Sequence, residues 1–262
     1  MKAFILCGGL GMRLREHTEA RPKPMVEIGG RPILWHIMKT YAHRGITDFV
    51  LCLGYKGEMI KDYFLNYEAR HCDFTVTLGA NQAVEVHGSR HDEDGWRVTL
   101  ADTGENAMTG ARIKRASRYL DPDEQTFCVT YGDGLINLDL QAVVAYHESH
   151  AGIATMTAVR PPSRFGELQH EQGRVVLFNE KPQVSEGLIN GGYLVFDRAF
   201  LDYLSEDDAC VMEREGFGRC ADDGRLYVYE HDGYWQCMDT YRDWLHLENQ
   251  WNSGQAPWKV WA

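Results

Sequence analysis

A glycine-rich loop directly follows the first apolar segment of this chain. Residues 2–7 read KAFILC, and residues 8–14 read GGLGMRL. Glycines placed at the end of a strand allow backbone amides to approach a phosphate group closely. The loop lacks the Gly-Lys followed by Ser or Thr of a Walker A motif, and Leu14 stands where the dinucleotide motif GxGxxG needs its last glycine. The pattern therefore predicts a phosphate-binding loop of another type, with an ordinary surface turn as the alternative.

Positive charge is concentrated beside this loop, although the chain as a whole is acidic. The 262 residues include 27 Lys and Arg against 38 Asp and Glu, a formal net charge of −11. Residues 11–31 alone contain five Lys and Arg against three Glu. A chain with this overall charge repels nucleic-acid backbones, so we expect no nucleic-acid partner. The local excess of cations instead favours a small polyanion such as a triphosphate.

Short apolar runs alternate with helix-period segments through the first 160 residues, and this order predicts what holds the loop. We expect strands at residues 2–7, 49–53, 74–78, 97–100, 127–131 and 154–159, and helices at 33–44, 58–67, 111–119 and 138–149. Because strands and helices alternate, we expect an α/β fold with a doubly wound, mostly parallel, Rossmann-like sheet.

The second half of the chain has a more mixed pattern. Strands are expected at residues 174–179, 192–196 and 226–231, and helices at 198–204 and 241–249. No low-complexity linker separates the halves, so we expect one domain over residues 1–262, with residues 161–262 forming a mixed lobe against the sheet of residues 1–160. We expect the aromatic tail to pack or to form a subunit interface through Trp244, Trp251, Trp258 and Trp261.

Composition and cysteine usage limit the class of protein further. The chain is 44% hydrophobic and 25% charged, which is typical of soluble globular proteins. Its first apolar run is too short for a signal peptide or a membrane span, so we expect no membrane partner. The seven cysteines are odd in number, and no two form a CxxC pair. These features favour a cytoplasmic protein without disulfides or a structural zinc site.

The loop belongs to a longer pattern of short motifs. Residues 21–38 read RPKPMVEIGGRPILWHIM, and further motifs follow in a fixed order: DTGENAMTGARIKR (102–115), YGDG (131–134), RFGEL (164–168), NEKP (179–182), INGGYLVF (189–196), GYWQCMDTYRD (233–243) and APWK (256–259). Together they closely resemble the sugar-phosphate nucleotidyltransferases, and within them the glucose-1-phosphate cytidylyltransferases. The resemblance runs the whole length of the chain.

The resemblance implies the reaction of CTP with α-D-glucose 1-phosphate to give CDP-glucose and pyrophosphate. An oxygen of the sugar phosphate would attack the α-phosphorus in line. This nucleophile is already an anion, because the second pKa of a phosphate monoester is about 6. No general base is needed, so we expect catalysis by positioning and by cationic stabilisation of the phosphates.

The resemblance also implies which residues hold the nucleotide. Arg13 and Lys23 are the expected catalytic cations, and Lys23 is held between two prolines that restrict its backbone. A surface ion pair is the alternative for each. Arg112 and its neighbours at 107–110 are expected near the cytosine. The full nucleotide-binding set is Leu6, Cys7, Gly8, Gly9, Leu10, Gly11, Met12, Arg13, Lys23, Ala107, Thr109, Gly110, Arg112 and Gly132.

Magnesium is the expected cofactor, because it binds one or two carboxylates together with phosphate oxygens. Asp133 follows a predicted strand, at the sheet edge where open α/β folds bind ligands, and we also expect it to be catalytic. Asp239 follows an apolar run late in the chain. Both match metal-binding aspartates of the family, whereas an Asp beside Gly can also be a plain turn former. We expect Asp102 to be structural.

The sugar phosphate is expected at a second group of residues. Lys181 would neutralise its phosphate, Glu180 would bind hydroxyls, and Trp235 would form a stacking wall. Surface ion pairing is the alternative for the charged members. The full set is Arg164, Gly166, Glu180, Lys181, Asn190, Gly191 and Trp235.

Several residues depart from the family pattern or lie outside it. Met12 stands where relatives usually have Thr or Ser, and Gly216 stands within a segment that in relatives usually reads Glu-Pro-Leu. We expect His36 to be packed rather than catalytic. Residues 91–94 read HDED, which is typical of a solvated loop.

Together with the resemblance, these observations lead us to expect a cytoplasmic, Mg²⁺-dependent cytidylyltransferase whose partners are CTP and a hexose 1-phosphate. The resemblance also implies a homo-oligomer. One alternative is a related nucleotidyltransferase that uses dTTP or UTP, or another phosphorylated acceptor. The other is a regulator that binds nucleotide without turnover.

Overall fold

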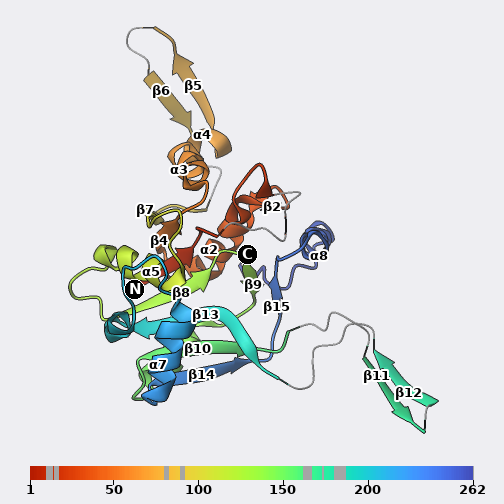
Figure 1. Cartoon of the computed structure of the whole chain (residues 1–262). Coiled ribbons are helices and arrows are strands. Elements are labelled where there is room, and N and C mark those ends of the chain that lie inside the picture. The colour runs from red at the N-terminus through yellow and green to blue at the C-terminus, as the bar shows by residue number, and fades with distance from the viewer. Residues whose placement is uncertain are drawn as a thin grey trace.

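A seven-stranded sheet forms the centre of the molecule in this computed structural model (Figure 1). The structure describes residues 1–9, 14, 18–79, 83–88, 92–161, 167–172, 174–179 and 187–261, with only the backbone at 167–171 and 177–179. The strand order is β14-β10-β13-β8-β1-β4-β7. The strands are β1 (Lys2–Leu6), β4 (Asp48–Leu53), β7 (Arg97–Asp102), β8 (Thr126–Tyr131), β10 (Ala154–Val159), β13 (Ile189–Asp197) and β14 (Leu226–His231).

The expected mostly parallel sheet is confirmed. β1 pairs in parallel with both β4 and β8, and β4 pairs in parallel with β7. β13 is antiparallel to both of its neighbours, β8 and β10, and β14 is parallel to β10. Six strands therefore run in one direction, and β13 alone among the seven opposes them. Since β13 and β14 belong to the same sheet as β1, the strands of residues 161–262 are not confined to a lobe against it.

Helices cover both faces of the sheet. Successive side chains of a strand point to opposite faces, so a strand that is apolar throughout presents apolar side chains to both. Along β1, Ala3 and Ile5 belong to one buried cluster, and Phe4 and Leu6 belong to the other. The first cluster includes residues of α2 (Ile33–Ala42), α3 (Gly57–Leu65), α6 (Leu140–Glu148) and α8 (Tyr241–Asn252). The second includes residues of α5 (Thr109–Ala116), of the 3₁₀ helix η4 (Arg198–Tyr203), of the π-helix η5 (Met212–Gly216) and of α7 (Phe217–Asp222).

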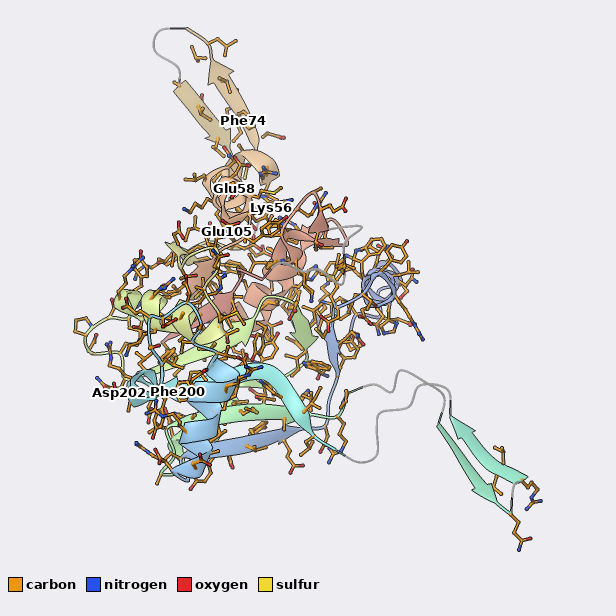
Figure 2. All side chains as sticks on the ribbon, in the orientation of Figure 1. Lys56, Glu58, Phe74, Glu105, Phe200 and Asp202 are labelled. Atoms are coloured by element: carbon orange, nitrogen blue, oxygen red, sulfur yellow. The ribbon has the colours of Figure 1, made fainter. Side chains whose placement is uncertain are left out.

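Four two-stranded sheets complete the strands of the described residues. They are β2 (Glu27–Ile28) with β3 (Arg31–Pro32), β5 (Asp73–Thr77) with β6 (Ala83–His87), β9 (Gly134–Ile136) with β15 (Trp235–Cys237), and β11 (Glu167–Glu171) with β12 (Arg174–Asn179). The β5–β6 hairpin extends away from the central sheet (Figures 1 and 2). The strand expected at 74–78 is real but does not join the parallel sheet, because its side chains, Phe74 among them, are largely exposed rather than buried on two faces.

Two helix predictions need correction. The helix expected at 198–204 is a short 3₁₀ helix, η4, which places Phe200 and Leu201 in the core. The helix expected at 58–67 is divided into α3 and α4 (Tyr67–His71) at Asn66. The Asn66 side-chain amide donates to the Asp62 carbonyl at 3.0 Å, which satisfies a last-turn carbonyl and favours an end there. The remaining short helices are η2 (Lys23–Met25) and η3 (Ser117–Tyr119).

The aromatic tail packs against α2, as expected. Trp258 is fully buried, and its indole Nε1 donates to Nδ1 of His36 at 3.3 Å. His36 Nε2 then donates to the Ile28 carbonyl at 2.9 Å, so the ring is a neutral tautomer with both nitrogens used. Burial lowers the pKa of His36 to about 4. The prediction that His36 is packed rather than catalytic agrees with this environment.

The loop expected to be solvated at 91–94 is only partly so. Glu93 is buried, accepts from the indole Nε1 of Trp35 at 2.9 Å and lies 3.5 Å from Nζ of Lys39. The expectation is therefore wrong for Glu93, because the loop folds back onto α2, where a lysine compensates its charge. His91 lies outside the described residues. Within the described part of the chain, no helix has the length and apolarity to cross a bilayer.

Candidate active site

Lys23 holds together two carboxylates that are far apart in the sequence. Its ammonium Nζ donates to Asp133 Oδ2 and to Asp239 Oδ1, both at 2.7 Å. The lysine lies in η2, where Pro22 is extended and Pro24 is buried, so the backbone at this position is fixed. Burial alone would lower the pKa of Lys23, but the Asp133 charge and the hydrogen bonds to both aspartates raise it above its ordinary value. The side chain is therefore positively charged at neutral pH.

The pairing of β9 with β15 brings the two aspartates to one place. Asp133 lies in the turn between β8 and β9, and its carbonyl accepts from the Met238 amide at 2.8 Å. Asp239 is the second residue after β15 and comes just before Thr240, the N-cap of α8. The Thr240 side chain and the Asp243 carboxylate form a capping box there, and Asp243 also accepts from the Asp239 amide at 3.1 Å. Both aspartates are thus fixed by backbone hydrogen bonds.

The same place offers ligands for a divalent cation. One ligand atom each of Asp133, Cys237 and Asp239 lies within 4.8 Å of the others. Two carboxylates fit the preference of Mg²⁺ for one or two protein oxygens plus phosphate and water. The thiol of Cys237 is a ligand for softer ions such as Zn²⁺. The sequence reasoning missed Cys237, although it stands two residues before Asp239.

Two cavities meet at this cluster. The first, of about 560 Å³, is lined on one side by Leu6, Gly8 and Gly9 and on the other by residues 105–109 and Arg112. The second, of about 790 Å³, is lined by Asn190, Gly191 and Trp235 among others. Both cavities are also lined by Tyr131, Asp133 and Asp239. Two ligands bound in them would therefore meet beside the paired carboxylates.

Most of the expected nucleotide residues that the structure describes line the first cavity. They are Leu6, Gly8, Gly9, Lys23, Ala107, Thr109, Arg112 and Gly132. Cys7 and Gly110 are buried and are not part of its wall. Gly110 lies against the segment before η5, where an added Cβ would stand 2.6 Å from Cys210 Sγ. Leu10, Gly11, Met12 and Arg13 lie outside the described residues.

Of the residues expected around the sugar phosphate, the second cavity contains Asn190, Gly191 and Trp235. The indole Nε1 of Trp235 donates to the Gly191 carbonyl at 2.8 Å, which fixes the ring as one wall. Arg164, Gly166, Glu180 and Lys181 lie outside the described residues. Asp102 accepts from the Gly104 amide at 3.1 Å, a turn contact that fits its expected structural role.

Arg112 connects the end of β4 with the loops after β1 and β7, around the first cavity. Its guanidinium donates to the carbonyls of Leu53 at 2.9 Å, Gly104 at 2.7 Å and Gly8 at 3.1 Å. It also donates to the Glu105 carbonyl and to Thr103 Oγ1. A Cβ added at Gly8 would stand 2.1 Å from Arg112 Cζ. Gly8 is therefore needed for this contact, and Arg112 shapes the cavity through carbonyl groups; its contact with a base stays a prediction.

The family model for nucleotidyl transferases matches residues 2–248, most of the chain. The chain belongs to the nucleotidyl transferase family. This nucleotidyl transferase is 49% identical over 261 residues to the glucose-1-phosphate cytidylyltransferase of Salmonella typhi, with full coverage of both chains. It is 44% identical to the probable glucose-1-phosphate cytidylyltransferase of Bacillus subtilis, again with full coverage. HddC from Yersinia pseudotuberculosis has the same fold, with a TM-score of 0.67 at 23% identity over 95% of this chain and 99% of that one.

Proposed function

We propose that this nucleotidyl transferase converts CTP and α-D-glucose 1-phosphate into CDP-glucose and pyrophosphate. The observation that carries the proposal is the meeting of two cavities at Lys23, Asp133 and Asp239. Identity of 49% and 44% over the full chain to glucose-1-phosphate cytidylyltransferases supports the choice of substrates.

The chemistry requires cations more than it requires a base. The oxygen of the sugar phosphate is already charged at neutral pH, since its second pKa is about 6. The P–O bond to the sugar phosphate forms as the bond from the α-phosphorus to pyrophosphate breaks, and negative charge grows on the leaving group. Lys23, held charged by its environment, would stabilise that charge once phosphates replace one of its carboxylate partners. Arg13 is our second candidate for this role.

The paired carboxylates fit a magnesium ion. Asp133 and Asp239 would hold it beside the phosphates, since each presents an oxygen toward the space that Lys23 now bridges. When bound, Mg²⁺ would neutralise phosphate charge and orient the α-phosphate for attack. Lys23 would then leave at least one carboxylate and move toward the triphosphate.

The remaining assignments concern the ends of the substrates. The cytosine would lie near Ala107, Thr109 and Arg112 in the first cavity. The glucose would lie near Asn190, Gly191 and Trp235 in the second, with Lys181 on its phosphate.

We also propose a cytoplasmic homo-oligomer. The apolar residues exposed on the β5–β6 hairpin, such as Phe74 and Val84, support a second copy as partner. Light scattering of the purified protein tests that assignment, and a monomer contradicts it.

A substrate screen tests the function. Four nucleoside triphosphates are combined with several sugar 1-phosphates in the presence of Mg²⁺, and pyrophosphate release is measured. We expect CTP with glucose 1-phosphate to give the highest kcat/KM. A preference for dTTP or UTP, or for another acceptor, would overturn the proposal in favour of a related transferase. Tight nucleotide binding without pyrophosphate from any pair would indicate a regulator instead.

A further inference from the structure

Glu213 bonds to residues of both cavity walls without lining either cavity. It lies in the π-helix η5, and its carboxylate accepts hydrogen bonds from two hydroxyl groups. Oε2 accepts from Thr109 Oγ1 at 2.5 Å, and Oε1 accepts from the hydroxyl of Tyr131. Thr109 lines the first cavity, and Tyr131 lines both. One side chain outside either wall thus holds two residues that form them.

The hydrogen bonds continue from Tyr131 to the second cavity. Asn190 Nδ2 donates to the Tyr131 hydroxyl at 3.3 Å, and Asn190 Oδ1 accepts from the Gly192 amide at 2.8 Å. Gly192 has a φ of +81°, and a Cβ there would stand 2.6 Å from the Tyr131 ring. The ring is therefore held from two sides. The Tyr131 hydroxyl donates to Glu213 and accepts from Asn190, so it links the two side chains.

The first cavity is attached to η5 by backbone contacts as well. The Met212 amide donates to Thr109 Oγ1 at 3.0 Å, and the Gly110 amide donates to the Cys210 carbonyl at 3.0 Å. Glu213 and its neighbours are thus bonded to the start of α5, and the Glu213 carboxylate is bonded to Tyr131 as well. Tyr131 is also the second residue before Asp133, so its position affects the turn that carries this carboxylate. Single turns of π-helix occur frequently at functional sites.

We propose that Glu213 is a positioning residue that couples the two substrate sites. It makes the geometry of the Thr109 wall depend on that of the Tyr131–Asn190 wall, so that nucleotide bound in the first cavity prepares the second for the sugar phosphate. The inference rests on the proposed function, which assigns one substrate to each cavity. A carboxylate suits the role because it offers two acceptor oxygens to two hydroxyl donors. A glutamine offers only one and turns an NH₂ group toward a hydroxyl.

Binding measurements test the coupling directly. The Kd of glucose 1-phosphate is measured by calorimetry with and without α,β-methylene CTP, which cannot transfer its nucleotidyl group. For the unaltered enzyme we expect nucleotide to tighten sugar-phosphate binding by a factor in the range of roughly 5–150. In Glu213→Gln this factor should fall to about 1. Tyr131→Phe, which removes only the hydroxyl, should reduce it similarly, and the double variant should lose no more than the stronger single variant.

A neighbouring glutamate provides the matched control. Glu215 lies on the same π-helix, is exposed, and accepts from the Val211 amide at 2.7 Å. Glu215→Gln should keep the wild-type coupling factor and a similar melting temperature. The proposal is overturned if the wild-type enzyme shows no coupling, if both Glu213→Gln and Tyr131→Phe keep it, or if Glu215→Gln loses it equally.

The proposed function has its own, separate readout in these experiments. If the wild-type enzyme releases pyrophosphate from another substrate pair, the substrate assignment fails, and the coupling is then measured with that pair and the matching methylene analogue. Loss of coupling in Glu213→Gln with that pair would still support the positioning role. Unchanged coupling would reject it.

Discussion

In the proposed reaction, Lys23 would serve both charge pairing and catalysis. Without phosphates, its ammonium compensates Asp133 and Asp239, which would otherwise repel each other across a small distance. In the proposed reaction, a bound divalent cation would take over that compensation and leave the lysine available to the triphosphate. The resting ion pairs thus keep three charged groups close together before any substrate binds.

Removing either partner should abolish turnover with little effect on folding. In Lys23→Ala and in Asp133→Asn, we expect kcat to fall by about 10²- to 10³-fold or more, because a preorganised charge at the phosphates is lost. The melting temperature should shift by only a few degrees, because the cluster lies at a cavity rather than in the core. Steady-state pyrophosphate release and thermal unfolding check this. Near-normal rates in either variant would remove that residue from the mechanism.

Cys237 should determine how the site responds to thiophilic metals. Its sulfur lies within reach of both carboxylates, so Zn²⁺ can bind two oxygens and one sulfur where Mg²⁺ binds oxygens only. We expect Zn²⁺ to inhibit the Mg²⁺-supported reaction, and Cys237→Ser to need about tenfold more Zn²⁺ for the same inhibition. Equilibrium dialysis with Zn²⁺ gives a second readout. Cys72 follows α4 directly and is not part of this cluster, so Cys72→Ser is the control and should behave as wild type.

At the scale of elements, short segments meet because single residues leave room for one another. The loop after β1 approaches α5 closely because Gly8 has no side chain. Arg112 of α5 then bonds to the loops after β1 and β7 and to the end of β4. The C-terminal tail docks on α2 through a direct hydrogen bond between Trp258 and His36.

Adjacent glycines should differ sharply in their tolerance of alanine. A Cβ at Gly8 would stand 2.1 Å from Arg112 Cζ, whereas a Cβ at Gly9 meets nothing within 4 Å. We expect Gly8→Ala to lower the free energy of unfolding by about 1–3 kcal/mol and to weaken nucleotide binding. Gly9→Ala should stay within about 0.5 kcal/mol of wild type. Urea unfolding of the two variants measures the difference, and equal effects would contradict the role given to Gly8.

Docking of the tail should make stability depend on pH through His36. Burial lowers its pKa from 6.5 to about 4, so the unfolded chain binds a proton more readily than the folded one. The contribution is therefore fully present above pH 6.5 and is lost as the pH falls toward 4. It amounts to about 3 kcal/mol. In urea unfolding series over this range, the free energy of unfolding of His36→Gln should fall less on acidification than that of wild type. Its value at neutral pH should be lower than that of wild type. Parallel profiles would reject the assignment.

At the scale of the whole molecule, the two halves of the chain share one sheet. β13 lies between β8 and β10, and β15 pairs with β9, so both halves contribute to the centre and to the candidate site. The aspartates that face Lys23 come from different halves. A stable site consequently requires the complete fold.

We therefore expect the chain to unfold in a single cooperative transition. Far-ultraviolet circular dichroism and tryptophan fluorescence should give the same midpoint in urea, because the two halves share one sheet. The two probes report on different parts of the chain, since five of the seven tryptophans lie after residue 230 while most strands precede it. CTP with Mg²⁺ at about 100 times Kd should then stabilise the whole molecule by about 2.7 kcal/mol. Two separate transitions, with only one of them shifted by ligand, would show that the halves fold independently.

The sequence determined what depends on residues close together in the chain. The alternation of apolar runs predicts β1, α2, β4 and β8 nearly at their observed bounds, because periodicity is a local property. The motifs also led to Lys23, Asp133 and Asp239, since resemblance in short segments carries over residue by residue.

Only the tertiary structure decided which distant groups meet. The ion pairs of Lys23, the thiol of Cys237 beside two carboxylates, the burial of Glu93 and the bonds of Glu213 depend on strand order and on how loops pack. The sequence pattern predicts β5 but not β6, and nothing local shows that the two strands form a hairpin outside the central sheet. Contacts of this kind arise from packing between elements, and residue types along a single segment do not specify it.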